Sequence, residues 1–213
     1  MGKCLIFCAG GFSALAEPIC PDDYILAADG GLQHLLSLGL QPHGIIGDFD
    51  SLGYVPEGAQ VFPVEKDDTD SMLAVRKGLE LGYREFILYG ALDGPRLDHA
   101  LANLQTLCFL ADHGATGYLV GLHNTAMTIR EETVTFPETA KGILSLFCMG
   151  PDALVSIRGA QYELENGTVS AAFPLGVSNH FVGKSVQVTV KKGCLVAIYD
   201  RENGFPTRSR EEL

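Results

Sequence analysis

The sequence has 213 residues, of which 46% are hydrophobic, and its 26 acidic and 15 basic side chains give a formal net charge of −11. This length suits one large or two small domains, and the apolar fraction is sufficient for a packed core. So acidic a chain is not expected to bind nucleic acid, because it lacks the basic surface that neutralises phosphates. No apolar run approaches the ~18 residues of a membrane span, so no membrane partner is expected either.

The first 124 residues alternate short apolar runs with segments of helical periodicity. We expect strands at residues 3–9, 24–28, 44–46, 60–64, 85–90 and 116–121, and helices at residues 31–38, 70–81 and 97–113. Thr69 or Asp70 can cap the second helix, and Gly82 and Gly114 stand where helices end. Apolar strands separated by helices are typical of a mainly parallel sheet that helices cover on both faces.

The helical periodicity disappears after about residue 124, and short β patterns replace it. We expect strands at residues 127–130, 133–136, 143–148, 154–158, 162–165, 168–172, 185–190 and 195–200. Turn signals separate them at residues 165–167, where Asn166 and Gly167 are typical of a hairpin, and at residues 192–193. Strands at this spacing indicate a small all-β sandwich or barrel.

The chain is therefore expected to contain two domains. Residues 1–124 form the α/β domain in this interpretation, and residues 125–213 form the all-β domain. The polar residues 208–213 are expected to be a frayed tail.

The six cysteines bear on the cellular compartment. They contain no CxxC pair, and several stand inside apolar runs such as CLIFC and LSLFC. This usage is typical of buried, reduced thiols and not of a disulfide framework or a zinc site. The first apolar run is too short for a signal peptide. We therefore expect a cytoplasmic protein.

Aspartate is concentrated in the first half of the chain, where the first 100 residues hold ten of the 13 aspartates. Asp29 follows the second expected strand, Asp48 and Asp50 follow the third, Asp70 follows the fourth and Asp98 follows the fifth. Ligands bind at the carboxyl ends of parallel strands, where these side chains would meet and repel one another. Turns and caps also use aspartate, but four converging acidic segments favour Mg²⁺ held against substrate phosphates.

Two common nucleotide-binding motifs are absent from the sequence. No GxxxxGK[ST] sequence occurs, and no GxGxxG opens a helix after the first expected strand. Asp48-Phe49-Asp50 has the DxD form of the haloacid-dehalogenase-type phosphatases, although Gly47 separates it from the preceding strand. A metal-dependent phosphatase therefore stays an alternative function.

Several segments together resemble one known family. ADGG, GDFDS, KDDTD and GPRLDHALANL, followed later by GVSN, resemble the thiamin pyrophosphokinases in sequence and in order. The resemblance implies a Rossmann-like N-terminal α/β domain that binds ATP and a C-terminal β-sandwich. It also implies a homodimer in which thiamin lies between one subunit's catalytic domain and the other's sandwich. The implied reaction transfers a pyrophosphoryl group from ATP to the thiamin hydroxyl, giving thiamin diphosphate and AMP.

The same resemblance implies catalytic roles for the matching acidic residues and one arginine. The Mg²⁺ ligands would be Asp48, Asp50 and Asp70, and the catalytic residues would be Asp29, Arg96 and Asp98. Arg96 would stabilise charge on the transferred phosphates, and Asp98 would complete the metal site or accept the proton of the attacking hydroxyl. The alternatives are a cap or Asx turn for Asp50, a strand-end turn for Asp29 and an exposed surface arginine for Arg96.

Contacts to ATP follow from the resemblance in the same way. The implied ATP-binding residues are Gly30, Gly31, Lys66, Thr69, Arg96, His99 and Asn103. The two glycines would permit close approach of the backbone to the ligand. Asn103 is alternatively a helix-packing amide, and Lys66 is alternatively a solvated lysine.

In the second domain, Ser178 and Asn179 match the thiamin-binding motif of the family. That motif often continues with glutamate, whereas this chain has His180. A sensor module that binds a nucleotide or thiamin without chemistry is a further alternative. The complete acidic set argues against it, because a sensor has no need for several metal-binding carboxylates.

Overall fold

A computed structural model describes residues 2–49, 53–63, 65 and 67–210. Two of the predicted site residues, Asp50 and Lys66, lie outside this part of the chain. The chain divides into two compact units, Met1–Leu122 and His123–Leu213, and the division falls two residues before the expected one. Each unit is described by itself below.

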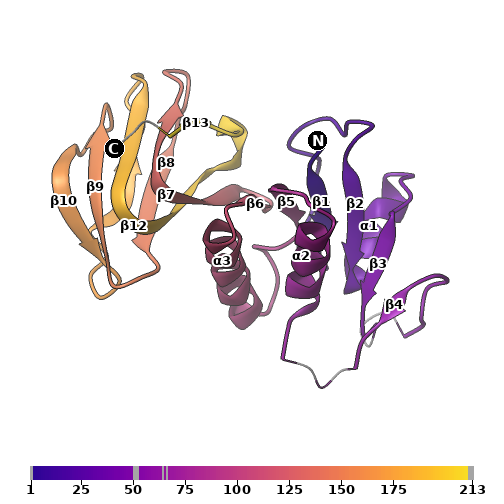
Figure 1. Cartoon of the computed structure of the whole chain (residues 1–213). Helices are drawn as coiled ribbons and strands as arrows, with labels where there is room; N and C mark the ends of the chain where they lie inside the picture. The colour runs from indigo at the N-terminus through magenta and orange to yellow at the C-terminus, as the bar shows by residue number, and fades with distance from the viewer. Residues whose placement is uncertain (1, 50–52, 64, 66, 211–213) are drawn as a thin grey trace. The chain divides into compact units, whose positions relative to one another are not determined.

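A parallel sheet with helices forms the first unit (Figure 1). Its strands are β1 (Cys4–Phe7), β2 (Tyr24–Ala28), β3 (Gly44–Gly47), β4 (Gln60–Val61), β5 (Glu85–Tyr89) and β6 (Thr116–Val120). They lie in the order β4-β3-β2-β1-β5-β6, and every neighbouring pair is parallel. β1 and β5 are almost entirely buried because apolar side chains face both ways along them. The predicted mixture of parallel strands and helices is confirmed.

Three α-helices and one 3₁₀ turn connect these strands. They are the 3₁₀ turn η1 (Asp29–Gly31) and the helices α1 (Leu32–Ser37), α2 (Asp70–Glu80) and α3 (Leu97–Asp112). Thr69 caps α2 by accepting a hydrogen bond from the Met72 amide, as predicted. α2 and α3 pack against each other, and α1 packs against β1 and β2.

The strand order reverses beside β1. The chain proceeds from β1 through β4 in one direction and then returns to place β5 on the other side of β1. In sheets of this kind the loops after the two central strands separate and leave a crevice at their carboxyl ends. The loops after β1 and β5 are therefore the expected walls of a ligand site.

Antiparallel strands form the second unit. They are β7 (Asn124–Phe136), β8 (Ile143–Cys148), β9 (Asp152–Arg158), β10 (Leu164–Ser170), β11 (Gly176–His180), β12 (Val186–Asp200) and β13 (Thr207–Ser209), with one 3₁₀ turn, η2 (Arg201–Asn203). The long strands β7 and β12 pair along almost their whole length. β12 also pairs with β9 near its beginning and with β8 near its end, while β11 pairs with β8 and β10 with β9.

Two predicted turns are wrong, because the chain continues through them as strand. Residues 165–167 lie inside β10, where the pairing register shifts and Asn166 has φ of 48°. Residues 192–193 lie inside β12 at a second register shift, and Gly193 has φ of 89°. A β-bulge needs the same left-handed residue as a hairpin turn, so the sequence signal is identical. The two strands predicted on either side of each signal therefore form one continuous strand, which is β10 in the first case and β12 in the second.

The C-terminal residues were also predicted wrongly in part. Thr207–Ser209 pairs with β7, and the Arg208 guanidinium binds the Glu132 carboxylate at 2.7 Å and the Thr128 carbonyl at 2.9 Å. This segment is held by a strand pairing and an ion pair, and it is not frayed.

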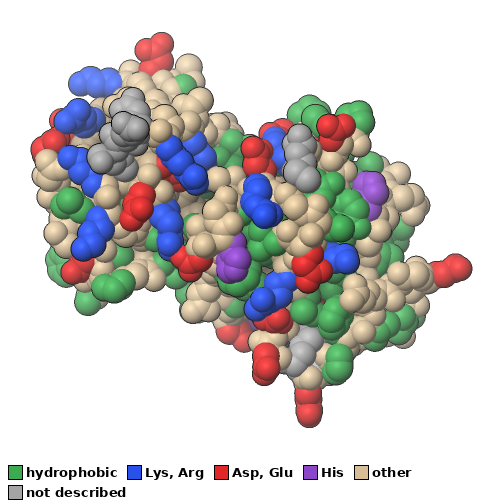
Figure 2. Space-filling view, viewed as in Figure 1, with side chains coloured by type: hydrophobic (Ala, Val, Ile, Leu, Met, Phe, Trp, Pro, Cys, Tyr) green, Lys and Arg blue, Asp and Glu red, His purple; other side chains and the backbone are tan. Residues whose placement is uncertain are grey.

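The described cysteines are free thiols, and Cys4, Cys8, Cys148 and Cys194 are buried. On the face shown in Figure 2, lysine and arginine side chains are interspersed with aspartate and glutamate. Within the described part of the chain, no helix has the length and apolarity that crossing a membrane requires.

Candidate active site

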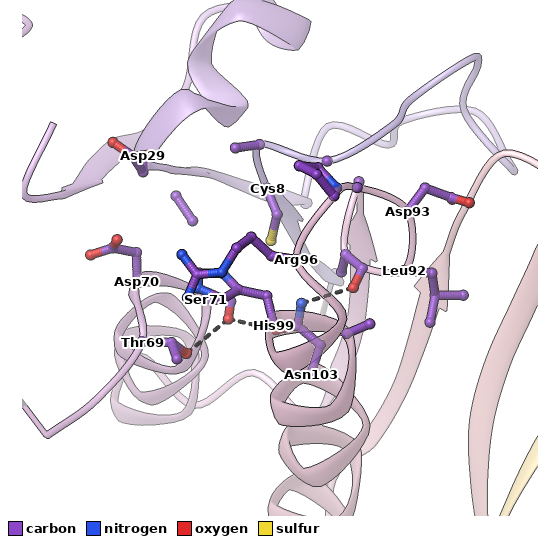
Figure 3. Close-up of a pocket in the computed structure, with 18 of the residues that line it drawn as sticks. Cys8, Asp29, Thr69, Asp70, Ser71, Leu92, Asp93, Arg96, His99 and Asn103 are labelled. Atoms are coloured by element: carbon purple, nitrogen blue, oxygen red, sulfur yellow. Dashed lines mark hydrogen bonds between the residues drawn. The ribbon is translucent and has the colours of Figure 1, made fainter. Parts of the chain in front are cut away.

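A cavity of about 700 Å³ lies at the carboxyl ends of the central strands of the first unit (Figure 3). The lining residues are 8–10, 28–29, 48, 68–71, 90–96, 99, 100 and 103. They come from the loops after β1, β2, β3, β4 and β5, from the first turn of α2 and from the first two turns of α3. The cavity is therefore the crevice that the reversed strand order creates.

Backbone contacts hold the loops after β1 and β5 together. The amide of Gly10 donates to the carbonyl of Gly90 at 2.9 Å, and the amide of Gly11 donates to the carbonyl of Asp93 at 3.1 Å. A Cβ at Gly10 would collide with the Asp93 carbonyl oxygen, so only glycine permits this approach. The Asp93 carboxylate accepts a hydrogen bond from the Leu122 amide at 2.6 Å, which fixes the same loop to the end of β6.

Five aspartates line the cavity: Asp29, Asp48, Asp68, Asp70 and Asp93. Asp29 directly follows β2 with φ of 47°, and Asp48 directly follows β3. Asp68 forms an ion pair with Arg76, in which Nε and Oδ2 are 3.0 Å apart. The structure thus brings together Asp29, Asp48 and Asp70 of the predicted site.

The residue after Asp48 holds this corner of the cavity. Phe49 is only 3% exposed and has φ of 59°, a left-handed conformation that bulky side chains rarely adopt. Its burial fixes the chain where it turns away from β3. The conformation therefore orients Asp48 through the packing of an aromatic ring.

The chemistry of these donors suits Mg²⁺, although no three described carboxylate, histidine or cysteine groups are close enough to enclose an ion by themselves. Carboxylate oxygens are hard ligands, and Mg²⁺ usually takes one or two of them together with waters and substrate phosphates. A cavity that contains Asp29, Asp48 and Asp70 fits an ion bound in this way.

Arg96 and Asp98 lie at the start of α3. Arg96 lines the cavity, whereas Asp98 stands on the exposed first turn and binds the Arg96 guanidinium. This hydrogen-bonded charge pair lowers the pKa of Asp98 to about 2. Arg96 is therefore placed to contact a ligand, and Asp98 is placed to contact Arg96.

Two buried side chains link the helices beneath the cavity. The Ser71 hydroxyl donates to Oδ1 of Asn103 at 2.7 Å, and Nδ2 of Asn103 donates to the Ala91 carbonyl at 2.8 Å. Asn103 thus packs between helices, as one of its two interpretations predicts, and it also lines the cavity, while its contact with ATP stays a prediction. Ser71 and Cys8 line the cavity too, although they were not among the predicted site residues. Their positions next to Asp70 and at the end of β1 were the available signals.

The remaining predicted ATP contacts divide into two groups. Thr69 and His99 line the cavity. Gly30 and Gly31 are not among its lining residues, and they belong to η1. The close backbone approach at Gly31 is to the Phe7 carbonyl of β1, with which a Cβ would collide. Gly31 is therefore required for packing of η1 against the sheet.

Ser178 and Asn179 lie on β11 of the second unit. Ser178 is exposed and has φ of 60°, while Asn179 is 6% exposed. The side-chain Oδ1 of Asn179 accepts a hydrogen bond from the backbone amide of Tyr162 at 2.9 Å, and its Nδ2 donates to the backbone carbonyl of Tyr162 at 2.8 Å. Asn179 therefore holds the segment that carries the exposed Tyr162 ring.

Family models match both units of the chain. Residues 19–119 match the model described as "Thiamin pyrophosphokinase, catalytic domain", and residues 131–195 match "Thiamin pyrophosphokinase, vitamin B1 binding domain". The chain belongs to the thiamin pyrophosphokinase family. The resemblance noted in the sequence is confirmed, and membership makes the chain an enzyme of the transferase class.

Solved structures from the thiamin pyrophosphokinase family share the fold. A family protein from Enterococcus faecalis is 27% identical with a TM-score of 0.77, over 94% of this chain and 99% of that one. The Bacillus subtilis thiamine pyrophosphokinase is 24% identical with a TM-score of 0.80, over 93% and 98% of the two chains. The yeast thiamin pyrophosphokinase, at 15% identity, has a TM-score of 0.73 over 93% and 86%. No curated protein sequence matches the chain.

Proposed function

We propose that this chain catalyses the Mg²⁺-dependent transfer of a pyrophosphoryl group from ATP to the hydroxyl of thiamin, forming thiamin diphosphate and AMP. The observation that carries the proposal is the cavity in which Asp29, Asp48, Asp70 and Arg96 face one space. Carboxylates alone would repel a polyphosphate, so this combination suits a polyphosphate that arrives with a divalent cation. Membership of the family supplies thiamin as the acceptor.

The metal-binding role belongs to Asp48 and Asp70, together with Asp50. Mg²⁺ in this position would neutralise charge on the ATP phosphates. Asp48 is held by the buried Phe49 ring, and Asp70 is held by the capped start of α2. The backbone beside both carboxylates is therefore held before the ligand arrives, which reduces the entropy lost on binding.

Arg96, which lines the cavity at the start of α3, is the residue proposed to stabilise the transferred phosphates. Its planar guanidinium can bind two oxygens at once, as it binds both oxygens of Asp98 in the ligand-free protein. Thr69, His99 and Asn103 line the adjoining wall and are proposed ATP contacts, as is Lys66. Gly31 acts through packing of η1, which carries Asp29 into the cavity, and Gly30 stays a proposed ATP contact.

The proposed reaction is a direct displacement at the β-phosphorus of ATP. The bond between the thiamin hydroxyl oxygen and this phosphorus forms, and the bond from the phosphorus to the oxygen of the α-phosphate breaks. AMP leaves with the electron pair, and a carboxylate, Asp29 or Asp98, accepts the hydroxyl proton. Asp98 is a weak base while Arg96 binds it. It becomes a stronger base once Arg96 turns to the phosphates.

The second unit is proposed to bind thiamin through Ser178 and Asn179. Ser178 offers an exposed hydroxyl, and Asn179 orients the neighbouring segment that carries Tyr162. We further propose that the working unit is a homodimer in which two chains share each site. His180 in place of the glutamate common in the family removes one negative charge beside the thiamin cation.

Product analysis tests this function. The purified chain is incubated with ATP, Mg²⁺ and thiamin, and the nucleotide products are separated. AMP formed in equal amount to thiamin diphosphate is the expected result. Formation of ADP, or AMP formation that does not depend on thiamin, would refute the proposal. Tight binding of ATP or thiamin without turnover would identify a sensor. A trapped phosphoaspartate at Asp48 would identify a phosphatase.

A further inference from the structure

A directional chain of hydrogen bonds runs beneath the cavity from Thr69 to Ala91. Ser71 has a single hydroxyl proton, and it points to Oδ1 of Asn103 at 2.7 Å. The contact of 3.0 Å between Thr69 Oγ1 and Ser71 Oγ must therefore be donated by Thr69. Asn103 completes the chain by donating from Nδ2 to the Ala91 carbonyl at 2.8 Å. Figure 3 shows these contacts between α2, α3 and the loop after β5.

The orientation of the Asn103 amide is determined by its two partners. The Ala91 carbonyl can only accept, so Nδ2 must face it and Oδ1 must face Ser71. Ser71 and Asn103 are 8% and 7% exposed, so water does not compete strongly for these bonds. Loss of one partner therefore leaves a buried polar atom of the other without its bond.

The chain of bonds joins the segments that carry the two halves of the proposed phosphate site. Ser71 directly follows Asp70, and Ala91 lies in the loop that leads to Arg96. Asp70 begins α2, and Arg96 directly precedes α3. The Ser71–Asn103 bond is a side-chain link between α2 and α3, and the bond from Asn103 to Ala91 extends this link to the loop before Arg96.

A second contact between the same helices lies farther from the cavity. The Arg76 guanidinium of α2 lies over the Phe109 ring of α3, with 5.0 Å between its central carbon and the ring centroid. This contact and the apolar packing keep α2 and α3 together when the first link is removed. Removal of the Ser71 hydroxyl should thus loosen the cavity ends of the helices without unfolding the unit.

We propose that Ser71 is a positioning residue, whose hydroxyl bond to Asn103 sets the distance between Asp70 and Arg96 so that both reach one bound ATP. This inference rests on the proposed function. Ser71 itself need not contact the nucleotide. Its hydroxyl sets the relative positions of Asp70 and Arg96, which do act on the nucleotide. Small displacements of such groups weaken binding and slow turnover.

Binding of Mg²⁺ with α,β-methylene ATP tests the inference, because this analogue lacks the oxygen bridge that the proposed reaction breaks. Calorimetry on the full chain should give about a tenfold larger Kd for Ser71→Ala, the order expected for loss of a buried positioning bond. Ser71→Thr, which keeps the hydroxyl, should restore most of the affinity. Thr106→Val is the matched control, because Thr106 is 1% exposed on α3 and its hydroxyl donates to the Ala102 carbonyl of the same helix.

Amide hydrogen exchange of the ligand-free protein gives an independent readout. Ser71→Ala should speed exchange about tenfold in the first turn of α2 and in the loop after β5, whereas Thr106→Val should not. In the double variant that combines Ser71→Ala with Asn103→Ala, the loss of affinity for the ATP analogue should not exceed that of Asn103→Ala alone. Additive losses, or a Kd for Ser71→Ala within twofold of wild type, would overturn the inference.

The proposed function is judged separately, on the wild-type chain. AMP formation from ATP and thiamin decides the function, whereas the comparison of Ser71→Ala with Thr106→Val decides the positioning role. If the wild-type chain binds the analogue and forms no AMP, the proposed function is wrong. The comparison of Ser71→Ala with Thr106→Val still decides the positioning role in that case.

Discussion

Arg96 and Asp98, two residues apart at the start of α3, bind each other through a fork of hydrogen bonds to both carboxylate oxygens. Nε of Arg96 is 2.9 Å from Oδ1 of Asp98, and Nη2 is 2.6 Å from Oδ2. The guanidinium thus presents to an aspartate the same fork that it would present to a phosphate. A polyphosphate in the cavity would compete with Asp98 for Arg96.

This competition predicts a shift in the titration of Asp98. Its pKa, about 2 in the ligand-free protein against an ordinary value of 3.8, is lowered chiefly by the hydrogen bond from Arg96. We expect Arg96→Ala, and saturation with the ATP analogue, to raise this pKa toward the ordinary value. Carboxyl ¹³C chemical shifts measured against pH report it. An unchanged pKa in Arg96→Ala would contradict the assigned cause.

The sign of the accompanying stability effect follows from the same shift. A carboxyl group whose pKa is lower in the folded state stabilises that state above its ordinary pKa. The contribution of this pair is therefore present at neutral pH and is lost as the pH falls from about 4 to about 2. Since both side chains are exposed, the effect on global stability is small.

The proposed role of Arg96 also predicts how kcat and KM change in the Arg96→Ala variant. If Arg96 acts on the transferred phosphates, kcat should fall about 100-fold while the KM for ATP changes much less. Arg96→Lys keeps the charge and loses the planar fork, so it should recover only part of the rate. Initial rates of AMP formation at several ATP concentrations measure both parameters. A raised KM with unchanged kcat would make Arg96 a ground-state contact.

The carboxylate at the end of β3 gives the third prediction. Asp48→Asn should reduce turnover at least about 100-fold, because a neutral amide is a poor Mg²⁺ ligand. Asp67→Asn is the matched control, since Asp67 is exposed and does not line the cavity. Both variants should keep the wild-type circular dichroism spectrum. Wild-type activity in Asp48→Asn would remove this residue from the metal site.

Much of the site was predictable because the edge of a parallel sheet collects residues that are distant in sequence. Asp29, Asp48 and Asp70 each follow a strand or begin a helix, and recognising those elements was enough to bring them together. The contact between Ser71 and Asn103 was not predictable in this way. It depends on how α2 and α3 pack, and no local pattern encodes the angle and distance between two helices.

The β part of the fold shows a different limit. Asn166 and Gly193 gave correct signals for left-handed backbone, but the chain uses these residues in bulges and not in turns. The choice depends on which strands pair on either side, and that is a property of the whole sheet. Gly31 was similarly recognised as a point of close approach, but to the Phe7 carbonyl and not to a ligand.

Thiol reactivity provides the fourth prediction. Burial raises the pKa of Cys4 to about 12, whereas Cys20 is exposed. At pH 7.5 iodoacetamide should alkylate Cys20 in the native protein and leave Cys4 unmodified until the chain unfolds. Peptide mass spectrometry with and without denaturant distinguishes the two sites. Modification of Cys4 at the native rate of Cys20 would show that its strand opens readily.

The ion pair between Arg208 and Glu132 gives the last prediction. Glu132 is 3% exposed, and it accepts hydrogen bonds from Arg208 at 2.7 Å and from the Arg130 amide at 3.4 Å. Arg208→Ala leaves this carboxylate buried without its charged partner, which should lower the free energy of unfolding by about 3 kcal/mol.

Arg158→Ala is the control for that variant, because Arg158 and Glu165 form a well-aligned ion pair with both side chains exposed. Its loss should cost less than about 1 kcal/mol, since water solvates both groups when the pair is broken. Urea denaturation of the three proteins measures the difference. Adding Glu132→Gln to Arg208→Ala should recover part of the stability, because the double variant buries a neutral amide and no unpaired charge. Equal losses for Arg208→Ala and Arg158→Ala would mean that burial of Glu132 does not govern the stability of this sheet edge.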